Sequence, residues 1–401
     1  MTQVSMARSL TKEARSEMKR RSRRFGVSAA LGVAILVMAT SSFAQETPPA
    51  HSKPWYRSIG VGVFLETTYT QNFNQPDSST NQFRVFDTKA GSLRFDVAEI
   101  VVEKKAAARG EAGFRVDALA GSSIPQVTAA SWLFRDDATG KAHVYDLLQA
   151  YASYVAPIAR GLKVDAGKFT THMGDEVVEG PDGYNTNASH SLLFGWAVPF
   201  THTGVRMTYP VSERLTAQAL VVTGWDNVKD NNGSMSIGGQ LLYSPLPTVA
   251  MALNVLSGPE KPQNDSDQRQ TFDYWITWKT NERISLAANA DYGNEAGDEL
   301  DRGRVSWYGM AGYARISFTE HAALSMRLEV FRDPDGERTG MMQTIREVTL
   351  TPEWKIGKSL VVRSDLRYDH SDEPVFERHD RQSSGQTTVS LNVIYLLTRG
   401  R

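Results

Sequence analysis

The chain has no cysteine among its 401 residues, and long hydrophobic runs are nearly absent. Without cysteine there is no disulfide framework, so the fold depends on packing, hydrogen bonds and ion pairs. The mean hydropathy is negative, which excludes a membrane protein built from several apolar helices. Positive and negative side chains nearly balance, at a formal net charge of −1, and no segment is basic enough to indicate nucleic-acid binding.

The one continuously apolar stretch, Phe25 to Ala39, lies close to the N-terminus. A basic segment, 19–24, precedes it, and Ser42-Phe43-Ala44 follows it. This order predicts a secretory signal peptide over 1–44, cleaved after Ala44. An uncleaved anchor is the alternative, although about fifteen apolar residues are short for a membrane span. The charged lead-in is long, so Met18 is a second candidate for the true start.

The rest of the chain is dominated by alternation of apolar and polar residues, which is typical of β-strands with two unlike faces. We interpret 45–56 as a periplasmic tail and 57–401 as one domain of about sixteen such strands, with fourteen as the alternative. The clearest strands are 59–69, 114–120, 205–209, 249–255, 272–278, 284–292, 324–330, 360–368 and 389–395. Between Leu93 and Val102 the apolar phase shifts, which predicts a β-bulge near Glu99.

Short and long connections alternate between these strands. The short turns lie near 104–110, 157–161, 210–213, 244–247, 280–282, 319–321 and 356–358. The long polar loops lie near 71–91, 121–143, 170–203, 224–235, 257–269, 294–306, 332–341 and 370–386. Turns at one end and loops at the other are typical of a transmembrane antiparallel up-and-down β-barrel.

The polar faces of the strands carry many charges, which favours a closed barrel over a soluble sandwich. In hydrocarbon every backbone polar group must be paired, and a closed sheet achieves this. Burying so many charges in a dry core would cost several kcal/mol each unless they were paired. Aromatic residues at strand ends would form the girdles at the membrane interfaces: Tyr209, Tyr243, Trp278, Tyr292, Phe318, Trp354, Tyr368 and Tyr395.

The third long loop, about 170–203, is the candidate functional segment. It has neither strand nor helix periodicity, and loops of this length inside a compact domain are usually functional or disordered. We expect it to fold into the lumen and to narrow the pore. Its acidic residues, Asp175, Glu176, Glu179 and Asp182, would face a basic wall of Arg115, Arg206, Arg315, Arg327, Arg363 and Arg367. Such charge rings set ion selectivity, although external carboxylates that only contact solvent are the alternative. The apolar run 192–200 predicts packing, either in the lumen or as part of strand six.

Catalytic interpretations have less support. His172, His190 and His202 lie in the same region as several acids, but their spacing matches no metal template. No Gly-x-Ser-x-Gly motif is present, so a lipid hydrolase lacks its nucleophile signature. We therefore expect no catalytic residue, no metal and no cofactor, with the histidines structural or lining the lumen.

Several segments resemble the OmpL-like β-barrel porin family of bacterial outer membranes, also called porin-2. They are GKFTTHMGDEVVE (167–179), SLLFGWAVPFTHTGVRMTYPVSERL (191–215), VTGWDNVKDNNG (222–233), NQFRVFD (81–87), AEIVVEKKA (98–106) and LRYDHSDEPVF (366–376). The resemblance implies one outer-membrane barrel, in contact with outer-membrane lipids, through which small hydrophilic solutes or ions pass. It transfers no substrate and no catalytic residue. A homotrimer is a further expectation, since sixteen-stranded porins commonly form trimers.

The sequence therefore predicts an exported porin that is not an enzyme. A non-conducting barrel with a structural or adhesive role is the competing hypothesis. One departure from the usual pattern is at the C-terminus, where Tyr395 is followed by six more residues instead of ending the chain. Either the last strand ends early and a tail follows it, or Tyr395 serves as the terminal aromatic.

Overall fold

The computed structural model describes residues 55–127, 133–134, 139–297 and 303–399, and almost all of them belong to strands and their connections. The first strands are β1 (Gly60–Asn72), β2 (Ser92–Lys104), β3 (Ala112–Ala120), β4 (Tyr145–Ala156), β5 (Leu162–Thr170), β6 (Thr201–Pro210), β7 (Leu215–Val222), β8 (Ser236–Leu246) and β9 (Val249–Pro259). They are followed by β10 (Gln268–Lys279), β11 (Ile284–Ala296), β12 (Arg304–Ser317), β13 (Ala322–Asp333), β14 (Gln343–Ile356), β15 (Leu360–Ser371) and β18 (Gly385–Arg399). The small strands β16 (Phe376–Arg378) and β17 (Arg381–Ser383) form a separate hairpin.

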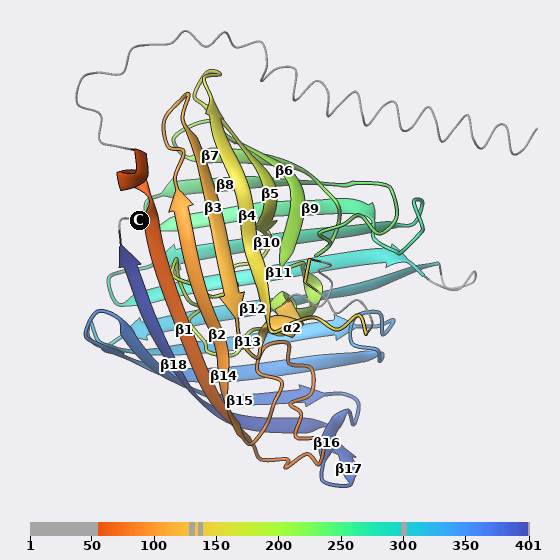
Figure 1. Cartoon of the computed structure of the whole chain (residues 1–401). Coiled ribbons are helices and arrows are strands. Elements are labelled where there is room, and N and C mark those ends of the chain that lie inside the picture. The colour runs from red at the N-terminus through yellow and green to blue at the C-terminus, as the bar shows by residue number, and fades with distance from the viewer. Residues whose placement is uncertain (1–54, 128–132, 135–138, 298–302, 400–401) are drawn as a thin grey trace, which may run out of the picture. The chain divides into compact units, whose positions relative to one another are not determined.

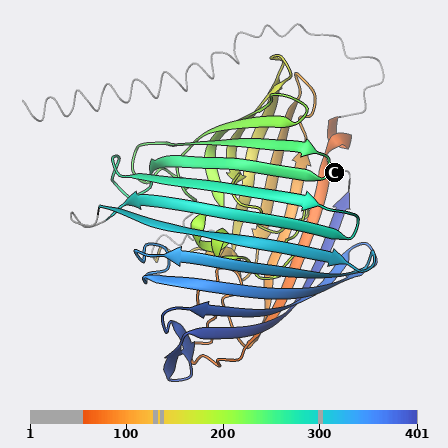
Figure 2. The same cartoon turned by 180° about the vertical axis from the view of Figure 1, so that it is seen from behind.

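The sixteen large strands form a closed antiparallel barrel, as predicted (Figure 1). Each strand pairs with its neighbours in the chain, and β18 pairs with β1 from Val61↔Arg399 to Asn72↔Thr388. Figure 2 shows the opposite wall, where the long strands coloured green to blue lie side by side. Closure leaves no unpaired strand edge, which is what a sheet in hydrocarbon requires.

The connections divide by length between the two rims of the barrel, also as predicted. We call one end the loop rim, where the connections are 73–91, 121–144, 171–200, 223–235, 260–267, 297–303, 334–342 and 372–384. We call the other end the turn rim, where the connections are 105–111, 157–161, 211–214, 247–248, 280–283, 318–321 and 357–359. The loop 73–91 and the β16–β17 hairpin meet at the loop rim through the Pro76–His379 bridge.

The phase shift in β2 lies three residues earlier than the alternation suggested. Thr67 pairs with Phe95 and Glu66 with Val97, so Asp96 is the extra residue. Phe95 is exposed on the outer face, whereas Val97 points inward and is buried. Because Val97 is apolar, it resembles an outward residue in the sequence, and the expected position near Glu99 was wrong.

The outer face is apolar with exposed aromatic residues near the rims. All the predicted girdle residues except the half-buried Tyr209 are exposed. β18 continues past Tyr395 to Arg399, so the last strand does not end early. The helices among the described residues are short, namely η1 (Trp55–Ser58), α2 (Ile124–Val127) and η2 (Leu193–Ala197), and none could cross a membrane.

The interior of the barrel is partly filled by an apolar cluster near the loop rim. The π-helix η2, which includes Phe194, packs there with its neighbours Leu192 and Phe200 against Trp307 of β12 and Phe331 of β13. Trp307 lies over Gly293 of β11, where a Cβ atom would come within 2.1 Å of the indole ring. The apolar run of the third loop is thus packed inside the barrel and is not an extension of β6.

Candidate functional site: the interior loop

The connection 171–200, which we call the interior loop, begins along the wall formed by β8 to β11. The carbonyl oxygen of His172 accepts a hydrogen bond from Gln240 Nε2 at 2.9 Å. The Gly174 N–H donates to Asp273 Oδ1 at 3.0 Å. Side chains that point inward from these strands therefore hold the backbone of the loop in place through hydrogen bonds.

Glu176 is the first loop carboxylate that pairs with an arginine. Its Oε1 lies 3.1 Å from Arg327 Nη1 and accepts the Tyr313 hydroxyl at 3.1 Å. Arg327 also pairs with Glu347 of β14 at 3.0 Å, and its side chain has no exposed surface. The two carboxylates compensate the positive charge of the buried guanidinium. Removing the arginine or a carboxylate would leave a buried charge without its partner.

Two more loop carboxylates form ion pairs further around the barrel. Both oxygens of Glu179 accept hydrogen bonds from Arg363 of β15 at 3.0 Å, in a bidentate arrangement. Asp182 lies 2.5 Å from Arg115 of β3 and is half exposed. Between His172 and Asp182 the loop thus follows the wall from β8 through β10, β13 and β15 to β3.

The return half of the loop is anchored by wall carboxylates instead. Asp365 accepts hydrogen bonds from the backbone and hydroxyl of Ser189, both at 2.7 Å. Glu329 accepts the backbone N–H groups of Leu192 and Leu193 at 2.8 and 2.6 Å. These bonds fix the start of η2 in place.

Two cavities border the loop segment Gly174–Glu176. The mid-barrel cavity, of about 400 Å³, lies between the loop and the wall of β3 to β10, and its lining includes Arg115, Arg206, Gln218, Gln240, Trp275, Gly174, Glu176 and Asp182. The turn-side cavity, of about 420 Å³, is lined inside the barrel by Asp175, Thr186, Thr277, Lys279, Ser285, Ala287, Tyr313 and Arg315. Both cavities are partly open.

The model of the family described as "putative beta-barrel porin-2, OmpL-like" matches residues 58–397. The chain belongs to this family. It is a porin-family β-barrel of the bacterial outer membrane. No curated protein matches the chain.

Solved outer-membrane channels share the fold of this porin-family chain at low identity. The channel DcaP of Acinetobacter baumannii has a TM-score of 0.59 at 9% identity, with 84% of this chain and 97% of that one covered. An anion-selective porin from Comamonas acidovorans has a TM-score of 0.55 at 10% identity, covering 84% and 99%. OmpT of Vibrio cholerae has a TM-score of 0.55 at 12% identity, covering 84% and 97%. At such identities the likeness shows the barrel fold alone.

The predicted site residues of the porin-family barrel fall into two groups. Arg327, Arg363 and Arg367 are at most 1% exposed, and the loop or neighbouring strands cover them. Arg367 pairs with Asp369 at 2.8 Å, and its Nη1 donates to the His190 carbonyl at 2.6 Å. These wall arginines touch their carboxylate partners directly and do not face them across a gap.

Glu179 is buried against Arg363, and the remaining predicted residues contact the cavities. Arg115, Arg206, Glu176 and Asp182 line the mid-barrel cavity, and Asp175 and Arg315 line the turn-side cavity. Arg206 is paired with Asp165 at 2.9 Å and stacks over Phe169. Arg315 is paired with Glu353 at 2.6 Å. Their role in a constriction stays a prediction.

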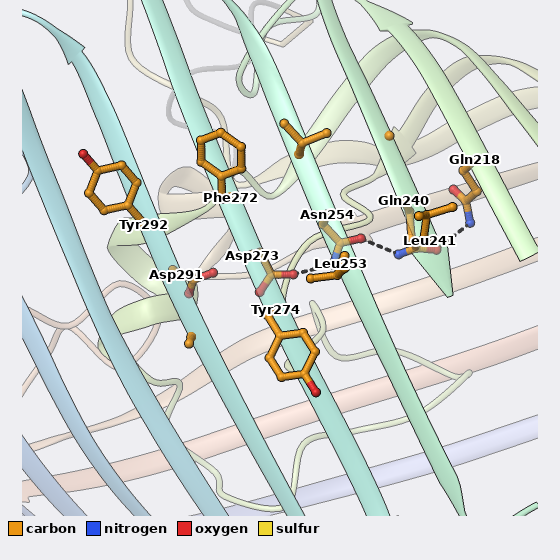
Figure 3. A pocket seen from close by; sticks show the side chains of 13 residues that line it. Gln218, Gln240, Leu241, Leu253, Asn254, Phe272, Asp273, Tyr274, Asp291 and Tyr292 are labelled. Atoms are coloured by element: carbon orange, nitrogen blue, oxygen red, sulfur yellow. Dashed lines mark hydrogen bonds between the residues drawn. The ribbon is translucent and has the colours of Figure 1, made fainter. Parts of the chain in front are cut away.

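A ladder of uncharged and acidic side chains on β7 to β11 was not singled out from the sequence (Figure 3). Gln218 donates to Gln240 at 2.9 Å, Gln240 to Asn254 at 2.8 Å, and Asn254 to Asp273. Asn289 also donates to Asp273, at 2.7 Å. The alternation does put these residues inward, but only the register between strands brings them to one level.

The same strands carry an apolar groove of about 560 Å³ on their outer side. Leu241, Leu253, Phe272, Tyr274 and Tyr292 line it, and all of them are exposed on the outer face (Figure 3). Its lining also includes the inward-facing residues Gln218, Gln240, Asn254, Asp273 and Asp291.

Burial shifts the pKa values of two titratable groups of the interior loop, upward for an aspartate and downward for a histidine. Burial, together with the nearby charges of Glu176 and Asp273, raises the pKa of Asp175 to about 7. Burial lowers the pKa of His172 to about 4, so this imidazole is neutral at pH 7.

The other two histidines of this region have structural contacts. His190 stacks on Phe86, and His202 lies 3.2 Å from the Thr171 hydroxyl. Within the described ranges no group of three or more His, Asp or Glu side chains could hold a metal ion.

Proposed function

We propose that this barrel is a porin that forms a water-filled channel for the passive diffusion of small hydrophilic solutes and ions. The observation that supports this most strongly is the pair of cavities on either side of Gly174–Glu176. A sixteen-stranded barrel is wide enough to enclose an aqueous path. The family membership and the barrel fold agree with this function.

The interior loop is the proposed constriction of the channel. It follows the inner wall, is held by ion pairs, and leaves the mid-barrel cavity beside β3 to β10 and the turn-side cavity beside β10 to β12. A loop fixed in this way narrows the lumen without moving, and its side chains would contact any solute that passes.

Planar-bilayer recording tests the channel. Purified full-length protein is expected to insert in discrete conductance steps that scale with salt concentration. Heat-denatured protein at the same concentration is the control. If folded protein gives no steps, the alternative of a structural or adhesive barrel replaces the proposal. The filled loop rim, with η2 against Trp307, is the feature that favours this alternative.

Export and processing belong to the proposal as well. The proposed signal peptide, 1–44, lies outside the described residues, as does most of the proposed tail 45–56. We expect mature protein isolated from outer membranes to begin at Gln45. N-terminal sequencing of that protein checks the cleavage site, and a start at any other residue would correct it.

The proposed assembly is a homotrimer. A trimer form is described for in-vitro folded OmpT of Vibrio cholerae, which has a TM-score of 0.53 to this chain at 10% identity. Light scattering of the detergent-solubilised protein, corrected for bound detergent, should give a mass three times that of the mature chain. A mass of one chain would leave the barrel as a monomeric channel.

A further inference from the structure

Three carboxylates where the interior loop meets β10 and β11 have no basic partner. They are Asp175 on the loop, Asp273 on β10 and Asp291 on β11. No arginine, lysine or histidine nitrogen lies within 4.0 Å of them in the described part of the chain, whereas Glu176, Glu179 and Asp182 each have an arginine there. Among the described residues, Glu329 on β13 and Asp365 on β15 also form no ion pair, but both accept backbone N–H hydrogen bonds from the interior loop.

Asp291 is the least compensated of the three. It is 4% exposed, and within the described ranges neither of its carboxylate oxygens has a hydrogen-bond partner. It lies directly opposite Asp273 in the antiparallel pairing of β10 and β11. Like charges opposite each other on neighbouring strands destabilise a sheet, and a buried carboxylate without donors is costly. Such a cost is more often kept where function needs it than in a purely structural wall.

Asp175 extends the group of unpaired carboxylates from the barrel wall to the edge of the turn-side cavity. Its backbone N–H donates to Asn289 Oδ1 at 3.0 Å, which holds the residue against β11. Its carboxylate has no hydrogen bond or ion pair within the described residues, and it is only partly buried. The side chain is therefore free to contact a solute in the cavity.

The basic groups around the same cavity do not cancel this charge. Arg315 forms an ion pair with Glu353, and Lys279 is exposed at the turn-rim end of β10. On the other side of the segment, Arg206 is paired with Asp165, and Arg115 contacts both Asp117 and Asp182. The path past Gly174–Glu176 thus has paired positive charges and unpaired negative ones.

We infer that the channel prefers cations and that Asp175, backed by Asp273 and Asp291, sets this preference. The inference rests on the proposed function, because it needs a conducting channel. Unpaired charge of one sign beside a narrow, low-dielectric path raises the local concentration of the opposite ion and repels its own. The carboxylates do not form a cage for a bound metal, so the effect acts on ions in transit.

Reversal potentials across a tenfold KCl gradient test the inference on the full-length mature protein in planar bilayers. The wild-type channel should pass K⁺ more readily than Cl⁻. Asp175→Asn should lower the K⁺/Cl⁻ permeability ratio by about twofold or more, because it removes the exposed part of the negative charge. Asp175→Glu keeps the charge and should retain the ratio. Asp291→Asn should change the ratio by less than Asp175→Asn does, because Asp291 is buried and lines neither the mid-barrel nor the turn-side cavity.

Glu213→Gln is the matched control, because this exposed residue lies in the turn 211–214 and its loss changes the net charge equally. It should leave the ratio unchanged. Retained heat-modifiable gel mobility shows that each variant still folds as a barrel. A conducting wild-type channel that prefers Cl⁻, or an Asp175→Asn channel with an unchanged ratio, overturns the inference and leaves the porin function standing. A wild-type protein without conductance overturns both.

Discussion

Asp175 and Glu176 are neighbours in the chain, yet the barrel treats their carboxylates in opposite ways. Glu176 is buried against Arg327 and Tyr313, within an arc of the wall where β13 to β15 supply arginines. Asp175 faces an arc where β8 to β11 supply amides and acids. Two acids that look equivalent in the sequence therefore have different roles. Glu176 holds the loop in place, and Asp175 leaves its charge available to the channel.

The largest effect is expected from breaking the paired arc. Arg327→Ala leaves Glu176 buried without a guanidinium and Glu347 with Arg367 at 3.6 Å, and loss of one partner of a buried pair costs about 3–5 kcal/mol. Urea unfolding in detergent should show this loss, together with larger and noisier conductance as the loop detaches. The control Arg283→Ala removes an exposed arginine of a short turn and should change stability by less than about 0.5 kcal/mol. Equal stability of the two variants would mean that the ion pairs do not hold the loop.

The next effect compares two loop carboxylates directly. Glu179→Gln weakens the bidentate contact to Arg363, which keeps an ion pair with Glu66 at 3.5 Å. Losing charge-assisted bonds should cost about 1.5–3 kcal/mol. Asp175→Asn should not lower the stability at pH 8, because no partner is lost and because the raised pKa of Asp175 means that its ionised form disfavours the folded protein. Urea unfolding of both variants at pH 8 checks this, and an equal loss in both would contradict the division of roles.

A slightly smaller effect is expected from the apolar packing that holds η2. Gly293→Ala places a methyl group against the Trp307 indole, and overpacking of this kind costs about 1–3 kcal/mol. Gly312→Ala on β12 is the matched control, because a Cβ atom there meets nothing within 4 Å. Trp fluorescence and urea unfolding report the change. If Gly293→Ala behaves like Gly312→Ala, Trp307 is not packed as described.

The smallest effect is a pH dependence of the ion preference. The pKa of Asp175 is raised to about 7, so its carboxyl is mostly neutral at pH 6 and mostly ionised at pH 8. Other charged or titratable groups nearby, from the loop and from β10 to β12, are Glu176, Asp273, Asp291, Tyr313, Arg315 and Lys279. The K⁺/Cl⁻ permeability ratio should rise from pH 6 to pH 8. In Asp175→Asn the rise should be absent, and a rise that persists would assign the titration to another group.

Most of the fold could be predicted because alternation is a local property. Each strand shows its two faces in its own residues, and the short and long connections show which ends share a rim. The error near Glu99 has the same origin, because Val97 is apolar but faces inward. The packing of 192–200 could be expected from its composition, but the π-helix against Trp307 and Gly293 could not.

Less of the candidate site could be predicted. Acids on the loop and arginines on the wall are visible in the sequence, but not which acid meets which arginine. Glu179 meets Arg363 and Asp182 meets Arg115 because the loop follows the wall, a path that no local pattern encodes. The ladder from Gln218 to Asp273 depends in the same way on the stagger of neighbouring strands.

The sequence by itself determined that the chain forms a closed barrel with a polar interior, because a period of two assigns every side chain to one face. The tertiary structure decided which interior charges are compensated. Charge pairing acts over a few ångströms between residues far apart in the chain, so only the register of the strands and the path of the interior loop could leave Asp175, Asp273 and Asp291 without a basic partner.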